Sequence, residues 1–140
     1  MRPSLLYRIA SILLILFAAG HTLGFRQVDP KWGVDSLVQS MRSVHFNASG
    51  SERTYWDFFV GFGLFVTVLM VLASIIAWQF GSLPPDTLAA LRVSAWGFAV
   101  CFAVVAYLSW RYFFIIPLIF SIAIFLCLTV AAWLSGGTTR

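Results

Sequence analysis

Residues 54–80 read TYWDFFVGFGLFVTVLMVLASIIAWQF, and Asp57 is the only charged side chain in this stretch. A helix needs about 20 predominantly apolar residues to cross the roughly 30 Å hydrocarbon core of a bilayer. The stretch is long enough, and Tyr55, Trp56 and Trp78 lie near its two ends, where aromatic residues meet the membrane–water interface. We therefore predict a transmembrane helix over residues 54–80.

Three further apolar stretches lie at about residues 5–24, 88–110 and 114–134. Backbone groups have no water to bond with inside a bilayer, so each stretch is expected to form a helix. The link at residues 111–113 is short, so the last two helices should form an antiparallel hairpin. The sequence thus predicts an all-α, polytopic membrane protein whose four helices form one antiparallel bundle over residues 1–140.

The first apolar stretch also resembles a secretory signal. Arg2 and Arg8 precede or begin its apolar core, and Ala18-Ala19-Gly20 resembles a cleavage site. The apolar run nevertheless continues through Leu23 and Phe25. We therefore expect a retained helix.

The composition limits the classes of partner. Charged residues make up 10% of the chain, compared with about 25% in a soluble domain. The net charge of +4 indicates basic flanks that meet anionic lipid headgroups, and the chain has no Lys/Arg run of the nucleic-acid type. Cys101 and Cys127 lie in apolar stretches, outside any metal or redox motif. Membrane lipids are the expected partners, and nucleic acid is not.

The outer loop, residues 25–53, is the only long polar connection. After Asp35 or Ser36 as a helix cap, five side chains follow at helical spacing. We predict a short amphipathic helix that lies on the membrane or covers the bundle. The five residues are Leu37, Val38, Met41, Val44 and His45.

Basic residues are almost balanced between the two sides, so their count does not decide the orientation. One side carries Arg2, Arg8, Arg92 and Arg140, and the other carries Arg26, Lys31, Arg42, Arg53 and Arg111. The start of the first helix, which has arginines and no acid, favours cytoplasmic termini. We expect a multi-pass protein of the cell inner membrane with its long loop outside.

His21 and Asp57 lie inside predicted spans near the outer interface and are the candidate catalytic residues, because intramembrane charge is costly. His21 comes three residues before Gly24, and Asp57 comes three residues after Thr54. Equal distances from the same interface predict similar depth. We therefore expect the imidazole of His21 to lie near the carboxylate of Asp57.

Further polar and aromatic side chains should surround this pair at the outer end of the bundle. The expected ligand-binding residues are His45, Arg42, Arg53, Tyr55, Trp56 and Arg111. Gly20, Gly24, Gly61 and Gly63 predict close helix packing there. Phenylalanines at 58, 59, 62 and 65 are expected mainly to face lipid or core, although they could also line a cavity for a flat apolar ligand.

Three chemical interpretations follow. His21 and Asp57 could handle a proton as a general acid–base pair. His21, His45 and Asp57 or Glu52 could bind a metal, although their spacing fits no metal motif and we assign no metal. Arginines at 42, 53 or 111 could hold the anionic head of a lipid. No motif identifies a cofactor, so the cofactor is unknown.

A local structural interpretation competes with all three. His21 could bond a neighbouring carbonyl, and Asp57 could cap its helix or pair with Arg53, four residues earlier. The arginines could extend to lipid headgroups.

The function that we expect is binding, and in one version transforming, a lipid or lipophilic small molecule in a pocket near the outer leaflet. His21 and Asp57 would be its polar centre. The alternative is a non-catalytic subunit that packs in a larger membrane complex or forms a homo-oligomer. A transporter is a third option, for which four spans would need a dimer.

Two segments carry a family resemblance: Gly20-His21-Thr22-Leu23-Gly24-Phe25 and Arg53-Thr54-Tyr55-Trp56-Asp57-Phe58-Phe59-Val60-Gly61-Phe62-Gly63. They resemble a group of small bacterial inner-membrane proteins of four helices. The resemblance covers the first half of the chain best. It implies the same fold and a bacterial inner membrane, and it implies no activity. In architecture alone the chain is also similar to DoxX-like and sterol-isomerase-type domains, but it carries no motif of either.

Overall fold

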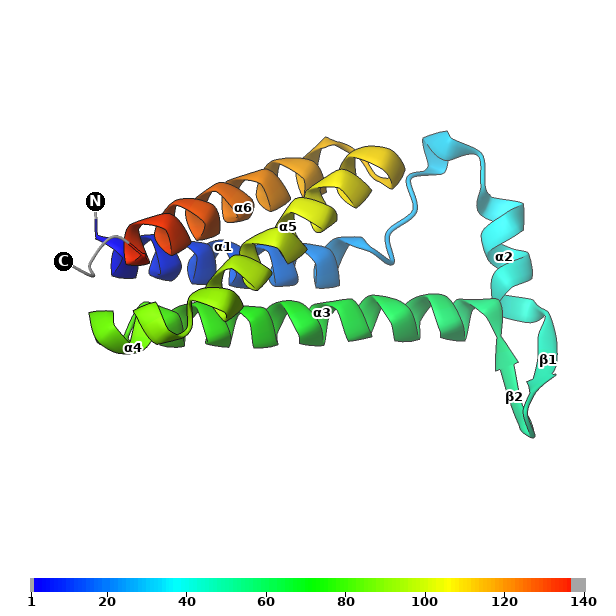
Figure 1. Ribbon diagram of the computed structural model, residues 1–140. Coiled ribbons are helices and arrows are strands. Elements are labelled where there is room, and N and C mark those ends of the chain that lie inside the picture. Colours follow the sequence, from blue (N-terminus) through cyan, green and yellow to red (C-terminus); the bar gives the residue numbers. More distant parts are fainter. Residues whose placement is uncertain (1, 137–140) are drawn as a thin grey trace. The chain divides into compact units, whose positions relative to one another are not determined.

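A computed structural model describes residues 2–136 of the chain, and most of these residues are helical (Figure 1). Four long helices coincide with the four predicted stretches and are long and apolar enough to cross a membrane. The all-α prediction is therefore confirmed. These helices are α1 (Pro3–Gly24), α3 (Tyr55–Phe80), α5 (Arg92–Tyr112) and α6 (Ile115–Ser135). Arg140, counted among the basic residues above, lies outside the described residues.

The remaining elements are short and lie in the two connections that contain proline. They are a 3-10 helix, η1 (Pro30–Trp32), the helices α2 (Asp35–Ser43) and α4 (Pro85–Ala90), and the strands β1 (His45–Ala48) and β2 (Ser51–Thr54). The amphipathic helix predicted in the outer loop is confirmed as α2.

The described residues form two compact units. The four-helix unit comprises the chain up to Phe17 and from Met70 onwards, and the loop unit comprises Ala18–Leu69. Both α1 and α3 contribute one segment to each unit.

The core of the four-helix unit contains apolar side chains from the four long helices and from the short helix α4. α1 and α3 run antiparallel in this unit, because Tyr7 packs edge-on against Phe80 while Ser11 bonds Ser74. The centre of the core consists of Leu6, Tyr7, Ala10, Leu14, Phe17, Ala77, Leu88, Ala99, Phe102, Ile124, Leu128 and Ala131.

Hydroxyl groups bond helix to helix inside this apolar core. Ser11 Oγ donates to the carbonyl of Ser74, and Ser74 Oγ donates to the carbonyl of Ser11, each at 2.9 Å. Ser109 Oγ and Ser121 Oγ lie 3.2 Å apart between α5 and α6. Serine suits these positions because small residues let helices approach closely while the hydroxyl bonds across the interface.

The predicted hairpin of the last two helices is present, with Phe113 and Phe114 in extended conformation between α5 and α6 (Figure 1). The predicted third helix, residues 88–110, is in contrast interrupted. Its first part belongs to α4, which begins at Pro85, and Leu91 breaks the run with a non-helical ψ of 18°. α4 begins at Pro85 without a side-chain cap, and proline suits the first helical position because an N–H there would have no partner within the helix.

The loop unit contains a β-hairpin in a place where the sequence predicts the end of a helix. α2 ends at Ser43, so Val44 and His45 leave the helical pattern, and β1 pairs antiparallel with β2. The turn needs two residues with positive φ, and Ser49 at 52° and Gly50 at 90° supply them. Such turns match the twist of a hairpin.

Candidate functional site

The start of α3 is fixed by a reciprocal pair of hydrogen bonds. Asp57 Oδ2 accepts from the backbone N–H of Thr54 at 2.8 Å and from its hydroxyl at 3.0 Å. Thr54 Oγ1 in turn accepts from the backbone N–H of Asp57 at 3.1 Å. This arrangement is a capping box, which satisfies N–H groups that a helix start leaves free. The local interpretation of Asp57 as a helix cap is therefore confirmed.

His21 has a different partner on α3. Its Nε2 lies 3.0 Å from the carbonyl oxygen of Gly63, and because a carbonyl can only accept, Nε2 carries the hydrogen. The ring of Phe25 stacks on the imidazole with centroids 5.0 Å apart. One turn after Gly63 on α3, Thr67 Oγ1 lies 2.9 Å from Thr22 Oγ1 of α1. His21 thus belongs to a polar contact between α1 and α3.

His21 and Asp57 do not bond each other as predicted: His21 bonds the carbonyl of Gly63, and Asp57 bonds Thr54. Gly63 follows Asp57 by six residues, a rise of about 9 Å along a helix. The same six residues turn the helix by about 240°, so Asp57 and Gly63 lie on different faces of α3. Equal distance from the helix ends predicted depth but not the direction around the helix. The catalytic roles of His21 and Asp57 stay predictions.

Aromatic side chains hold α2 and the β-hairpin against the first turns of α3. The guanidinium carbon of Arg42 on α2 lies 4.1 Å from the ring centroid of Trp56, a close cation–π contact. The ring of Phe46 on β1 stacks on Phe58 with centroids 5.8 Å apart, and it packs at a tilt against Tyr55 with centroids 4.9 Å apart.

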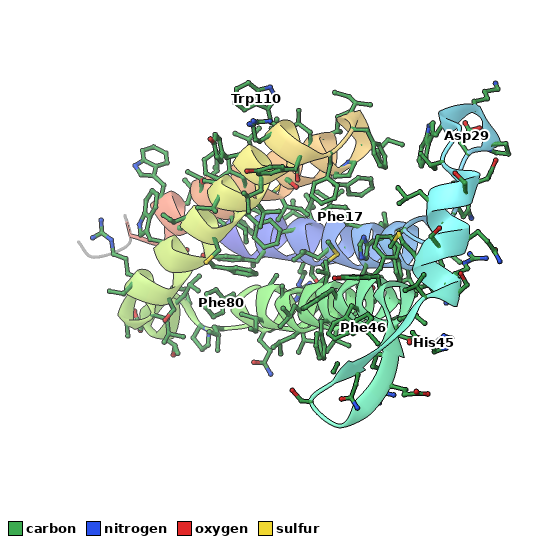
Figure 2. All side chains as sticks on the ribbon, turned by 90° about the vertical axis from the view of Figure 1, so that its right-hand side faces the viewer. Phe17, Asp29, His45, Phe46, Phe80 and Trp110 are labelled. Carbon is green, nitrogen blue, oxygen red and sulfur yellow. The ribbon has the colours of Figure 1, made fainter. Side chains whose placement is uncertain are left out.

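Successive residues of β1 point to opposite sides, as in any strand. Figure 2 accordingly shows Phe46 directed toward α3 and His45 directed away from it. The exposed ring of His45 bonds the carbonyl of Ser43 through Nδ1 at 3.0 Å. His45 therefore does not join His21.

The predicted site residues divide into three groups. Arg42, Tyr55 and Trp56 form the aromatic contacts at the start of α3, and Arg53 lines a groove described below. Arg111 belongs to the four-helix unit, where its guanidinium lies over the ring of Tyr112 at 5.3 Å.

The metal interpretation has no support from the geometry. Among residues 2–136, no three His, Cys, Asp or Glu side chains gather closely enough to hold a metal ion. Both histidines instead bond backbone carbonyls.

A shallow groove of about 250 Å³ runs along one face of α3. Asp57, Gly61 and Phe65 are spaced at four-residue intervals and so lie in one row on the helix. Two charged side chains stand at one end of the groove, and phenylalanine rings line the rest. The lining residues are Arg53, Asp57, Phe58, Gly61, Phe62 and Phe65.

Gly61 and Gly63 have opposite roles although they are two residues apart, which is about 200° around a helix. A Cβ on Gly61 would meet nothing within 4 Å, whereas a Cβ on Gly63 would overlap the ring of Phe25. Gly20 and Gly24 also have no atom within 4 Å of an added Cβ. Of the four glycines from which close packing was predicted, Gly63 alone lies in a tight helix contact within the loop unit.

We expect Gly63→Ala to destabilise the protein by about 1–3 kcal/mol, because the added methyl displaces Phe25 from its place beside His21. Gly61→Ala should leave the free energy of unfolding unchanged or raise it by up to about 1 kcal/mol, since alanine favours a helix. Unfolding in lipid bicelles measures both variants. The ¹⁵N shift of His21 Nε2 should change only in Gly63→Ala. Equal stabilities would contradict the assignment of the two faces.

We expect Thr54→Ala to cost about 1 kcal/mol, because it removes the hydroxyl from the capping box. Thr54→Ser keeps the hydroxyl and should behave like the original protein. Hydrogen exchange should accelerate at the amides of Tyr55 to Phe58 in the alanine variant only. Unchanged exchange there would show that the cap does not hold the start of α3.

Comparisons with protein-family models, with curated proteins and with solved structures give no match for this chain.

Proposed function

We propose that the chain is a multi-pass membrane protein that binds a lipid or another lipophilic molecule in the groove on α3. The groove itself carries the proposal. Its charged end, at Arg53 and Asp57, fits a polar head, and its row of phenylalanines fits a hydrocarbon tail. This places the polar centre at Arg53 and Asp57 and gives His21 a supporting role, in which it holds α1 against α3.

The length of α3 supports this placement of head and tail. Its 26 residues span about 39 Å, compared with about 30 Å of hydrocarbon. A centred α3 therefore extends by about one turn at each end, which puts Asp57 at headgroup level. From Asp57 to Phe65 the rise is about 12 Å, close to the depth of one leaflet.

The size of the groove limits which ligands it can hold. Pockets for drug-sized ligands enclose about 300–1,000 Å³ and bury most of the ligand. A groove of about 250 Å³ that is open along one side suits one hydrocarbon chain lying against α3. Its location on a candidate spanning helix gives membrane lipid direct access. We propose binding and assign no chemical step.

The proposed setting is a bacterial inner membrane with both termini in the cytoplasm. The arginines at the start of α1 support this orientation, since the first helix often sets the topology. The loop unit, and with it the charged end of the groove, would then face the outer leaflet.

Self-association is the second candidate function. Gly20 and Gly24 leave part of α1 free of side-chain bulk, and nothing within 4 Å would meet a Cβ on either. Small residues spaced by four favour helix pairing in lipid. Cross-linking through cysteines placed beside Gly20 tests this option, and a uniformly monomeric protein would exclude it.

We expect Gly61→Leu to remove one bound lipid without unfolding the protein, because the new side chain fills the groove. Gly97→Leu on α5 is the matched control, since Gly97 also has nothing within 4 Å of an added Cβ and lies outside the groove. Native mass spectrometry after purification in mild detergent counts the bound lipids. Equal lipid retention in both variants would overturn the proposed function.

A further inference from the structure

We infer that the groove prefers a zwitterionic phospholipid whose head carries a primary ammonium group. The inference rests on the proposed function and adds the chemistry of the head. Arg53 would hold the phosphate, Asp57 would hold the ammonium, and the phenylalanine row would take one acyl chain.

Arg53 keeps most of its donors for a ligand. Within the protein, Arg53 Nη1 donates to the carbonyl of Glu52 at 2.7 Å. A guanidinium has five N–H donors in a planar fork that matches the oxygens of a phosphate. Because Arg53 lines the groove on its charged side, the remaining donors can reach a phosphate that lies at headgroup level.

Asp57 uses only one of its two oxygens within the protein. Both bonds from Thr54 end on Oδ2, so Oδ1 is left to accept from a ligand. A carboxylate oxygen bonds an ammonium N–H in a charge-assisted contact, which is stronger than a neutral hydrogen bond. The capping box also fixes the direction in which Oδ1 points.

The charges of Arg53 and Asp57 are near enough to attract each other, but no hydrogen bond joins the two side chains. Arg53 bonds Glu52, and Asp57 bonds Thr54. One positive and one negative group at the same end of an apolar groove match the two charges of a zwitterionic head. A purely anionic head would be attracted by the guanidinium of Arg53 but repelled by the carboxylate of Asp57.

The contacts also favour a primary over a quaternary ammonium. A quaternary head has no N–H for Asp57 and is usually recognised by aromatic faces. The face of Trp56, the best aromatic group near this end, is already covered by Arg42 at 4.1 Å. Phe58 stacks with Phe46, and Tyr55 packs against the same ring at a tilt.

The test is competition among phosphatidylethanolamine, phosphatidylcholine and phosphatidylglycerol of identical acyl chains, mixed in equal amounts with delipidated full-length protein. Native mass spectrometry reports which lipid is bound. We expect the ethanolamine lipid to be favoured about threefold or more over each of the other two, the gain from one exposed charge-assisted contact.

Three variants separate the contributions. Asp57→Asn keeps an oxygen for the cap but removes the charge, so it should abolish the preference for ethanolamine over choline while lipid is still bound. Glu52→Gln, a neighbouring acid outside the groove, should leave the preference intact. Arg53→Gln should weaken the binding of all three lipids, because it removes the group that would hold the phosphate.

The outcomes distinguish the two proposals. Equal binding of the three lipids, or a preference for the glycerol head, overturns the headgroup inference while the loss of lipid in Gly61→Leu still supports the groove. A preference that survives Asp57→Asn also overturns it. If Gly61→Leu retains its lipid, the proposed function fails and the headgroup inference fails with it.

Discussion

The capping box between Thr54 and Asp57 is the contact on which the candidate site depends. A helix start leaves several N–H groups without partners in the helix, and side-chain caps can satisfy them. Asp57 bonds the N–H of Thr54 at the start of α3, and the same side chain lines the groove. The same carboxylate retains an oxygen at the charged end of that groove. One side chain therefore serves both the fold and the proposed binding of a head.

A second constraint separates the two faces of α3 in the loop unit. Toward α1, the carbonyl of Gly63 accepts from His21, and Thr67 approaches Thr22. Toward the groove, Gly61 leaves space that no side chain fills. Helices in lipid associate through packing and hydrogen bonds, because apolar burial gives no advantage there. The polar contacts therefore lie between the helices, and the face left with phenylalanines is free to meet a hydrocarbon chain.

Apolar length and composition were sufficient to predict the four long helices, and helical spacing predicted α2. The hairpin was missed because Val44 and His45 continue the spacing of α2, while the turn signal at Ser49 and Gly50 is short. The charged members of the groove, Arg53 and Asp57, were candidates from the sequence. Their association with Phe62 and Phe65 was not, since exposed phenylalanines on a spanning helix are ordinary. The pairing of His21 with Asp57 failed because depth does not specify rotation about a helix axis.

In the proposed complex, an acyl chain lies along Gly61, Phe62 and Phe65. A phospholipid with a photoactivatable group midway along its acyl chain tests this most directly, with mass spectrometry locating the cross-links. We predict adducts concentrated on Phe62 and Phe65, because a bound chain stays beside them. Adducts spread evenly over exposed apolar residues of α6, such as Ile122 and Leu126, would contradict a groove that holds lipid.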